Sequence, residues 1–239
     1  MDTVEIQNIP FANYSMAEFL QILEKRLVDE QKTFVVTANP EIVMYANKDK
    51  QYYKALAKAD FIVPDGIGVV IASKILKKPL KERVAGFDLM GNLLKLAAKK
   101  NLRVYFLGAK EKTVEKTVNN IQKTHPGLQI VGYHHGYFDI DDEKIATTIA
   151  ELKPDLVFVA LGYPKQEFWI ERYLHRFDKG IFMGVGGSFD IWAGEVKRAP
   201  DLWIKLHLEW LYRIIQEPKR IKRMSALPRF MLRVLFMRK

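Results

Sequence analysis

The sequence predicts an α/β protein with a Rossmann-like, layered and mostly parallel sheet flanked by helices, followed by a C-terminal helical appendage. Six short apolar runs alternate with helical patterns along the 239 residues, and such runs are typical of buried parallel strands. Strands that alternate with helices favour a layered α/β fold. The composition then shifts near Pro200, where the chain becomes strongly basic. We therefore expect a core over residues 1–196 and an appendage over residues 197–239.

The elements of the core follow in order. Residues 4–14 predict a short hairpin or an edge strand, and Ser15 and Glu18 have the spacing of a capping box that starts a helix. The strands of the sheet are expected at residues 33–37, 61–64, 102–107, 128–132, 155–161 and 180–185. Helices are expected between them at residues 41–58, 67–78, 87–100, 111–124, 142–152 and 165–177.

The appendage has its own helical pattern. From residue 201 the stretch DLWIKLHLEWLYRIIQEP predicts one amphipathic helix that Pro218 ends, and two short helical segments are expected on either side of Pro228. Residues 197–239 contain twelve basic and three acidic residues, which accounts for nearly all of the net charge of +10. The positive charge is therefore local, and it indicates an anionic partner.

Aromatic and apolar residues alternate with these cations. Five apolar residues can share a helical face opposite Arg229 and Arg233, and aromatic residues accompany them: Leu227, Phe230, Met231, Val234 and Leu235, with Trp203, Trp210, Tyr212 and Phe236. This pattern is typical of a helix in a membrane interface. Nucleic acid is the alternative partner, but apolar residues in helical register favour an anionic membrane surface. The sequence shows neither a spanning segment nor a signal peptide, so we expect a cytoplasmic protein that is peripheral on the inner face of the cell membrane.

Polar and glycine-rich residues follow most of the expected strands. Ligands of open α/β sheets bind beyond the carboxyl ends of the strands, so these residues predict a ligand site at one rim: Thr37 and Asn39, Asp65, Gly108, Gly162, and Gly184 to Ser188. A carboxylate at such a place, as in Asp65, can act as a general base, although Asp-Gly is also a common turn pair. Thr37 and Asn39 can bind sugar hydroxyls, or they can cap the helix that follows.

Two segments of this rim suit phosphate. The segment ALGYPKQEFWI places Gly162 and Gln166 where a strand turns into a helix, and GVGGSFD supplies a second glycine-rich loop. A helix N-terminus and closely approaching backbone both favour phosphate, so a nucleotide or another phosphorylated ligand is expected. The P-loop and dinucleotide-binding signatures are missing from the sequence, which argues against a P-loop nucleotide site and against an NAD site.

No metal ion and no other cofactor is expected. Asp139 and Asp141 form an Asp-x-Asp pair, but they are more typical of the acidic start of a helix. His134 and His135 are adjacent, which is not the spacing that points two ligands the same way. The absence of cysteine excludes disulfides, cysteine nucleophiles and thiolate ligands. A departing diphosphate would therefore need guanidinium groups, and the candidates are Arg83, Arg213, Arg220 and Arg223.

Six motifs resemble one known family when their order and spacing are taken together. They are TANPEIV, PDGIGVV, ERVAGFDLM, ALGYPKQEFWI, GVGGSFD and AGEVKRAP, and they span about residues 35–215. In this combination the chain resembles the WecG/TagA/CpsF family of glycosyltransferases. The resemblance implies inverting transfer of a sugar from a UDP-sugar, which is a substrate, to a polyprenyl-diphosphate-linked acceptor. Some members add N-acetylmannosamine to undecaprenyl-diphosphate N-acetylglucosamine in the linkage unit of wall teichoic acid.

The resemblance also implies roles for individual residues. Asp65 would be the base that deprotonates the acceptor hydroxyl, with Thr37 and Asn39 beside the reacting sugars. Substrate and nucleotide would be bound by Arg83, Gly108, Tyr137, Gly162, Gln166, Gly187 and Asp190. Arg213, Arg220 and Arg223 would lie over the lipid diphosphate. Three alternatives stay open: a family member with another UDP-sugar donor, a membrane-recruited nucleotide-binding protein without catalysis, and an NAD-dependent oxidoreductase. An apolar tail also allows a homo-oligomer in solution.

Overall fold

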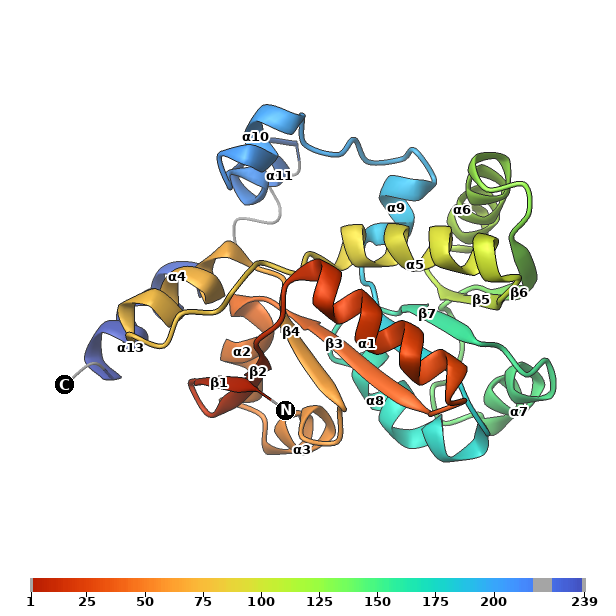
Figure 1. The fold of residues 1–239 in the computed structure, drawn as a ribbon, viewed down its shortest axis with the longest axis horizontal. Coiled ribbons are helices and arrows are strands. Elements are labelled where there is room, and N and C mark those ends of the chain that lie inside the picture. Colours follow the sequence, from red (N-terminus) through yellow and green to blue (C-terminus); the bar gives the residue numbers. More distant parts are fainter. Residues whose placement is uncertain (1, 217–224, 238–239) are drawn as a thin grey trace.

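The core of the molecule is a six-stranded parallel sheet with helices on both faces (Figure 1). The computed structural model describes residues 2–216 and 225–237. The strands lie in the order β4-β3-β8-β7-β5-β6, and every neighbouring pair is parallel. Their bounds are β3 (Thr33–Ala38), β4 (Phe61–Pro64), β5 (Arg103–Gly108), β6 (Gln129–His134), β7 (Leu156–Ala160) and β8 (Ile181–Gly184). The expected α/β fold and its six strands are confirmed.

The helices of the core connect these strands. They are α2 (Pro40–Ala46), α3 (Lys50–Leu56), α4 (Ile67–Ile75), α5 (Gly86–Lys100), α6 (Glu111–Thr124), α7 (Glu143–Glu151), α8 (Lys165–Tyr173) with the short η1 (Leu174–Arg176), and α9 (Ser188–Trp192). The single helix expected at residues 41–58 is wrong. The chain leaves α2 at Asn47, and the Asp49 side chain then caps α3 by accepting hydrogen bonds from the backbone N–H groups of Gln51 and Tyr52.

A hairpin and one helix precede the sheet. Strands β1 (Thr3–Ile6) and β2 (Ile9–Ala12) form a separate antiparallel pair, as the sequence predicts. Helix α1 (Met16–Val28) begins with the expected capping box. Ser15 Oγ accepts from Glu18 N at 3.3 Å, and Glu18 Oε2 accepts from Ser15 N at 2.8 Å. The capping box thus gives hydrogen-bond partners to two backbone N–H groups at this helix start.

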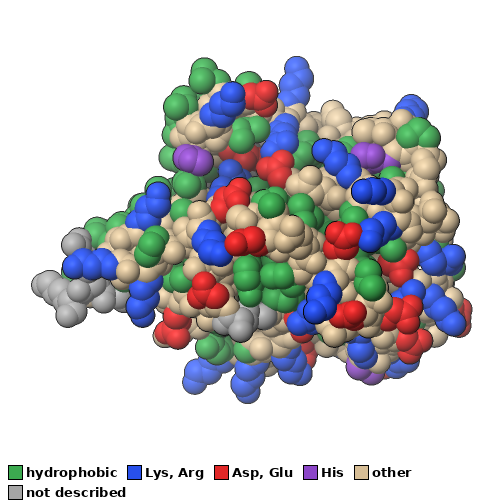
Figure 2. Space-filling view, viewed as in Figure 1, with side chains coloured by type: hydrophobic (Ala, Val, Ile, Leu, Met, Phe, Trp, Pro, Cys, Tyr) green, Lys and Arg blue, Asp and Glu red, His purple; other side chains and the backbone are tan. Residues whose placement is uncertain are grey.

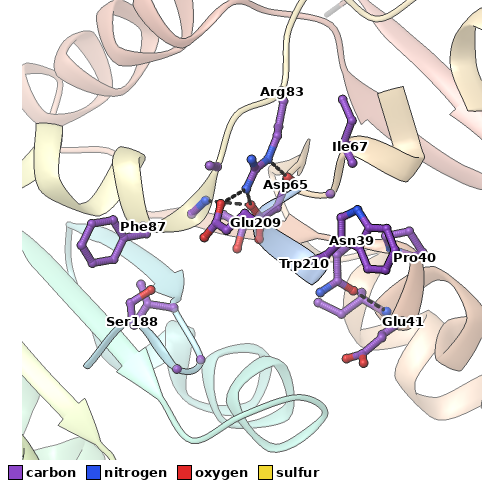
Figure 3. Close-up of a pocket in the computed structure, with 18 of the residues that line it drawn as sticks. Asn39, Pro40, Glu41, Asp65, Ile67, Arg83, Phe87, Ser188, Glu209 and Trp210 are labelled. Carbon is purple, nitrogen blue, oxygen red and sulfur yellow. Dashed lines mark hydrogen bonds and ion pairs between the residues drawn. The ribbon is translucent and has the colours of Figure 1, made fainter. Parts of the chain in front are cut away.

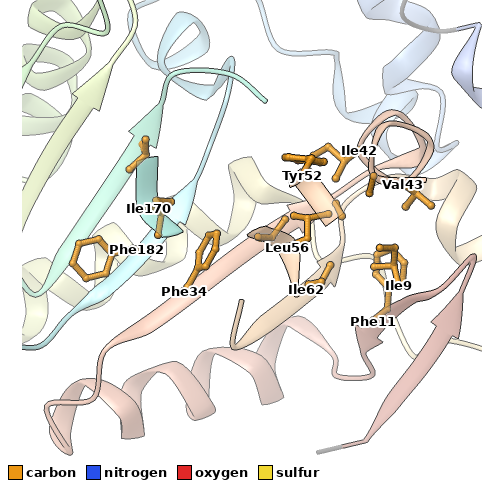
Figure 4. Close-up of a cluster of buried hydrophobic side chains, with 14 of the residues drawn as sticks. Ile9, Phe11, Phe34, Ile42, Val43, Tyr52, Leu56, Ile62, Ile170 and Phe182 are labelled. Carbon is orange, nitrogen blue, oxygen red and sulfur yellow. The ribbon is translucent and has the colours of Figure 1, made fainter. Parts of the chain in front are cut away.

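The sheet separates two apolar clusters. Along β3 the side chains alternate, so that Phe34 and Val36 belong to one cluster and Val35 to the other. Figure 4 shows the first cluster, in which Phe34 and Phe182 of the sheet lie with Ile170 of α8 and with side chains of α2 and α3. The second cluster gathers side chains of α1, α5 and α6. Burial on both faces explains why the strands read as continuous apolar runs.

The appendage contains α10 (Asp201–Lys205), α11 (Glu209–Gln216) and α13 (Ala226–Met237). The single helix expected from residue 201 is wrong, because the chain turns at His207, which has a left-handed φ of 60° between α10 and α11. Pro228 does not separate two helices. It lies in the first turn of α13, where a proline needs no N–H donor.

Helix α13 belongs to the core rather than standing apart from it. It packs against α2 and α4, and the Phe230 and Val234 side chains are fully buried. Gln7 Nε2 donates to the Phe230 carbonyl oxygen at 3.1 Å. These two residues therefore do not lie on an exposed membrane face with Leu235, as the helical pattern alone predicts. Within the described ranges no helix is both long and apolar enough to cross a bilayer.

Candidate active site

A pocket of about 280 Å³ opens at the carboxyl ends of the parallel strands. Four chain segments that follow β3, β4, β7 and β8 meet there, as the rule for open α/β sheets requires. In chain order the contributing residues are Thr37 and Asn39; Asp65 and Gly66; Gly162, Tyr163 and Gln166; and Gly184 to Ser188. The structure therefore brings together most of the rim residues that the sequence singles out.

The rest of the pocket lining comes from two other places. One is the segment before α5 and its first turn, including Arg83, Phe87 and Asp88; the other is the appendage, which contributes His207, Glu209, Trp210, Ile214 and Leu227. Figure 3 shows Trp210 near Asn39 and Pro40, on the same side as Ile67. Trp210 is thus part of the pocket wall, although its sequence pattern suggested a membrane contact. The appendage closes the pocket as well as following the core.

Asp65 is one of the residues that line this pocket. Its side chain does not cap α4, whose N-cap is Gly66 without a side-chain hydrogen bond. Instead Asp65 Oδ1 accepts from Gly86 N, at the start of α5, at 3.2 Å. A carboxylate is stabilised at a helix N-terminus. The side chain keeps 30% of its surface exposed, so the carboxylate remains accessible to a ligand.

Arg83 holds Asp65 and connects it to the appendage. Its Nε donates to the Asp65 carbonyl oxygen, and its Nη2 lies 3.6 Å from Asp65 Oδ1 and 3.0 Å from Glu209 Oε2. Burial opposes the charge of the guanidinium, but Asp65 and Glu209 outweigh this effect, so the pKa of Arg83 is raised. Arg83 is therefore a permanent cation shared by two carboxylates.

Thr37 and Asn39 each make a structural hydrogen bond beside the pocket. Thr37 Oγ1 donates to the Gly184 carbonyl oxygen at 3.3 Å, which joins β3 to β8. Asn39 Oδ1 accepts from Ile42 N at 3.1 Å and caps α2. The capping interpretation of Asn39 is confirmed. The bond uses Oδ1 only, so capping and ligand binding through the amide nitrogen are compatible at this residue.

Gln166 is hydrogen-bonded to the glycine-rich loop that follows β8. It is buried, and its amide bridges two groups: Nε2 donates to Glu167 Oε1 at 2.7 Å, and Oε1 accepts from Gly186 N at 3.1 Å. Gly184 leaves room for this amide, because a Cβ there would lie 2.5 Å from Gln166 Nε2. Burial raises the pKa of Glu167 to about 7, against the opposing hydrogen bond from Gln166. A buried polar pair thus sets the shape of the loop from Gly184 to Gly187.

The comparison with known proteins decides the family. Residues 4–239 match the glycosyl transferase WecG/TagA/CpsF family. The chain belongs to this family. The resemblance carried by the six motifs is confirmed, and the WecG/TagA/CpsF match extends beyond them in both directions.

Three curated relatives carry one name, N-acetylglucosaminyldiphosphoundecaprenol N-acetyl-beta-D-mannosaminyltransferase. The relatives from Bacillus spizizenii and Bacillus subtilis strain 168 are each 44% identical over 236 residues, which cover 98% of this chain and 91% and 92% of theirs. A relative from Staphylococcus aureus strain MW2 is 40% identical over 233 residues, covering 97% of this chain and 91% of its own. The similarity therefore includes the core and the appendage of this WecG/TagA/CpsF family member.

Other candidate residues lie away from the pocket lining. Gly108 ends β5 with a φ of 126° and packs against the Ala160 backbone, while Tyr137 is 72% exposed after β6. Asp190 lies in α9, where its carbonyl oxygen accepts from two following N–H groups. A binding role for these three would need a ligand that extends beyond the pocket. Arg220 and Arg223 fall outside the described residues, as does the Arg213 side chain.

The acidic segment before α7 has local roles. Asp139 Oδ1 accepts from Asp141 N at 3.0 Å, and Asp142 caps α7 through Lys144 N. In the parts of the chain that the structure describes, no three His, Asp or Glu side chains are grouped as a metal would require. Glu209 is the site residue that sequence reasoning missed. Its only signal was an acid at the start of an amphipathic helix in a strongly basic segment.

Proposed function

We propose that this protein is an inverting glycosyltransferase that moves N-acetylmannosamine from UDP-N-acetylmannosamine to undecaprenyl-diphosphate N-acetylglucosamine, in synthesis of the wall teichoic acid linkage unit. The observation that carries the proposal is the 44% identity, over 98% of the chain, to relatives with this activity in their name. The pocket adds the geometry, with Asp65 open to a ligand at the carboxyl ends of the strands.

The proposed reaction is one displacement at the anomeric carbon of the donor sugar, which inverts its configuration. The acceptor hydroxyl forms the new bond, its proton passes to Asp65, and the bond to the diphosphate breaks so that UDP leaves. Asp65 suits the base role because Gly86 and Arg83 hold it while part of its surface faces the pocket. Thr37 and Asn39 would contact the reacting sugars, since both line the same pocket.

We propose that the departing diphosphate is stabilised without a metal ion. The loop from Gly184 to Ser188 lines the pocket, and its glycines let the backbone approach phosphate closely. The N–H groups of Val185, Gly186 and Ser188 already donate within the protein, so this approach is the main contribution that we expect from the loop. The Asp-x-Asp segment forms a turn before α7, which leaves it a structural role. Arg213, Arg220 and Arg223 would add positive charge over the diphosphate, as the resemblance to the family implies.

We propose that the enzyme reaches its lipid-linked acceptor by docking its appendage on the inner face of the membrane. On α13 the exposed apolar side chains are Leu232, Leu235 and Phe236, next to the exposed Arg229 and Arg233. Figure 2 shows hydrophobic and basic side chains mixed over the surface of α10 and α11. Each cation near an anionic leaflet contributes on the order of 1 kcal/mol. A few such contacts would recruit the protein reversibly.

A donor and acceptor panel in EDTA tests the proposal. Wild-type enzyme should release UDP from UDP-N-acetylmannosamine with the lipid-diphosphate N-acetylglucosamine acceptor. Asp65→Asn should slow turnover about 10²–10⁴-fold, the usual effect of losing a general base. Asp139→Asn is the matched control and should keep the full rate, which also tests the metal alternative.

Each other outcome of the panel is informative. A folded Asp65→Asn enzyme with full turnover would remove Asp65 as the base. Turnover with a different UDP-sugar alone would change the donor, and UDP binding without turnover on any donor would support a non-catalytic nucleotide-binding protein. Tight binding of a dinucleotide in place of UDP would instead support the oxidoreductase.

A further inference from the structure

One acidic residue of the basic appendage is buried against the pocket. Glu209 begins α11 and is only 6% exposed. Its Oε2 lies 3.0 Å from Arg83 Nη2, in the segment that leads to α5. Figure 3 shows the Arg83 side chain reaching both Asp65 and Glu209. A carboxylate is rarely buried without a partner, so its position in a segment dominated by cations requires a specific explanation.

The guanidinium of Arg83 joins the core to the start of α11. Its Nε is used by the Asp65 carbonyl oxygen, and its Nη2 faces the carboxylates of Asp65 and Glu209. The Arg83 and Glu209 side chains are 19% and 9% exposed, so solvent and salt screen the pair weakly. Charge-assisted hydrogen bonds of this kind fix orientation strongly. The same contact therefore orients the group beside Asp65 and holds the start of α11.

Helices α10 and α11 pack against each other beside this contact. The rings of Trp203 and Tyr212 lie 5.6 Å apart and join the two helices. Figure 1 shows this pair set apart from the helices that cover the sheet. Trp210 directly follows Glu209 and forms part of the pocket wall. The contact between Glu209 and Arg83 therefore also holds the neighbouring Trp210 at the pocket wall.

We propose that Glu209 is a positioning residue that latches the appendage to Arg83, so that closing the pocket wall and orienting Arg83 beside Asp65 are one event. The catalytic consequence rests on the proposed function, but the latch itself does not. The latch explains why an acid lies at this position of a basic tail.

Limited trypsin digestion of the full chain tests the latch, because cleavage of a transiently opened segment follows the population of the open form. Cleavage after Lys205 should be about tenfold faster in Glu209→Gln than in wild type, the scale of a typical coupling between two sites. Arg83→Gln should accelerate it similarly, and the double variant should be no faster than either single variant. Asp201→Asn, which removes an exposed acid of the same appendage, is the matched control and should match wild type.

Activity supplies the second readout. Glu209→Gln should lower kcat about tenfold while the KM for the donor changes by less than about threefold, as expected when an interaction acts after ground-state binding. The latch would be overturned if Glu209→Gln were cleaved after Lys205 at the wild-type rate and kept the wild-type kcat. Additive increases in the cleavage rate of the double variant would also overturn it. If the protein turned over no donor but the Glu209 and Arg83 variants still affected trypsin cleavage non-additively, the proposed function would be refuted and the latch would stand.

Discussion

Glu167 gives the sharpest quantitative prediction, because one buried carboxyl should impose a pH dependence on the whole fold. The side chain is 1% exposed, and burial raises its pKa from an ordinary 4.5 to about 7. The folded state therefore binds this proton more tightly than the unfolded chain does. The resulting destabilisation is absent below about pH 4.5, grows as the pH rises, and is complete above about pH 7.

The magnitude follows from these two pKa values. Linkage gives a loss of about 2.5 kcal/mol in the free energy of unfolding between about pH 5 and pH 8 from this group alone. For a chain of this size that corresponds to a fall in Tm of about 5–10 °C. Glu167→Gln should remove this part of the pH dependence. The amide has nearly the same shape and can still accept from Gln166 Nε2.

The assay is thermal or urea unfolding of both proteins across this pH range. The difference in slope is the quantity to compare, because any constant cost of the amide in the buried site cancels from it. The wild-type free energy should fall relative to the variant as the pH rises. Parallel pH profiles would refute the reasoning, since they would mean that Glu167 titrates alike in the folded and unfolded states.

Two further predictions concern the fold. Phe230→Ala should lower the free energy of unfolding by about 3–5 kcal/mol, the usual range for a buried ring, because this side chain is fully buried. Phe236→Ala, at 74% exposure, is the control and should change it by no more than about 0.5 kcal/mol. Equal Tm values for the two variants would mean that α13 does not pack into the core. Gly108→Ala should cost about 2–4 kcal/mol through backbone strain and overpacking. The new Cβ would lie 2.4 Å from the Ala160 carbonyl carbon at a φ of 126°, while Gly127→Ala, with a nearest atom at 4.0 Å, is the control and should unfold like wild type.

The sheet could be predicted from the sequence because its signals are local. A strand buried on both faces needs an apolar run, and each of the six runs lies within a residue or two of an observed strand. The same apolar runs also predicted the residues at the rim, because the C-terminal end of each parallel strand lies at the edge of the sheet where ligands bind. The break between α2 and α3 was missed because residues 41–58 read as one continuous helical pattern. The cap that Asp49 provides for α3 lies inside this pattern.

The appendage was harder to predict because its decisive contacts are long-range. The helical pattern of α13 shows that one face is apolar but does not show what covers it. Phe230 is covered by the core, and Gln7, more than two hundred residues earlier in the chain, bonds to its backbone. Glu209 is similar: its partner Arg83 is 126 residues away. Periodicity carries no information about such pairs.

The appendage therefore cannot be treated as one removable module. Helix α13 packs on α4 so closely that a Cβ on Gly68 would lie 2.6 Å from the Leu227 side chain, and Phe230 and Val234 complete an apolar cluster of the core. Deleting residues 200–239 would expose that cluster and destabilise the fold, so loss of activity in a truncated chain would not separate membrane docking from folding. We expect substitutions at the exposed Leu232, Leu235 and Phe236 to affect the proposed membrane docking alone, and Glu209→Gln to affect the proposed closure. Comparing these two sets of variants separates the functions that a truncation would combine.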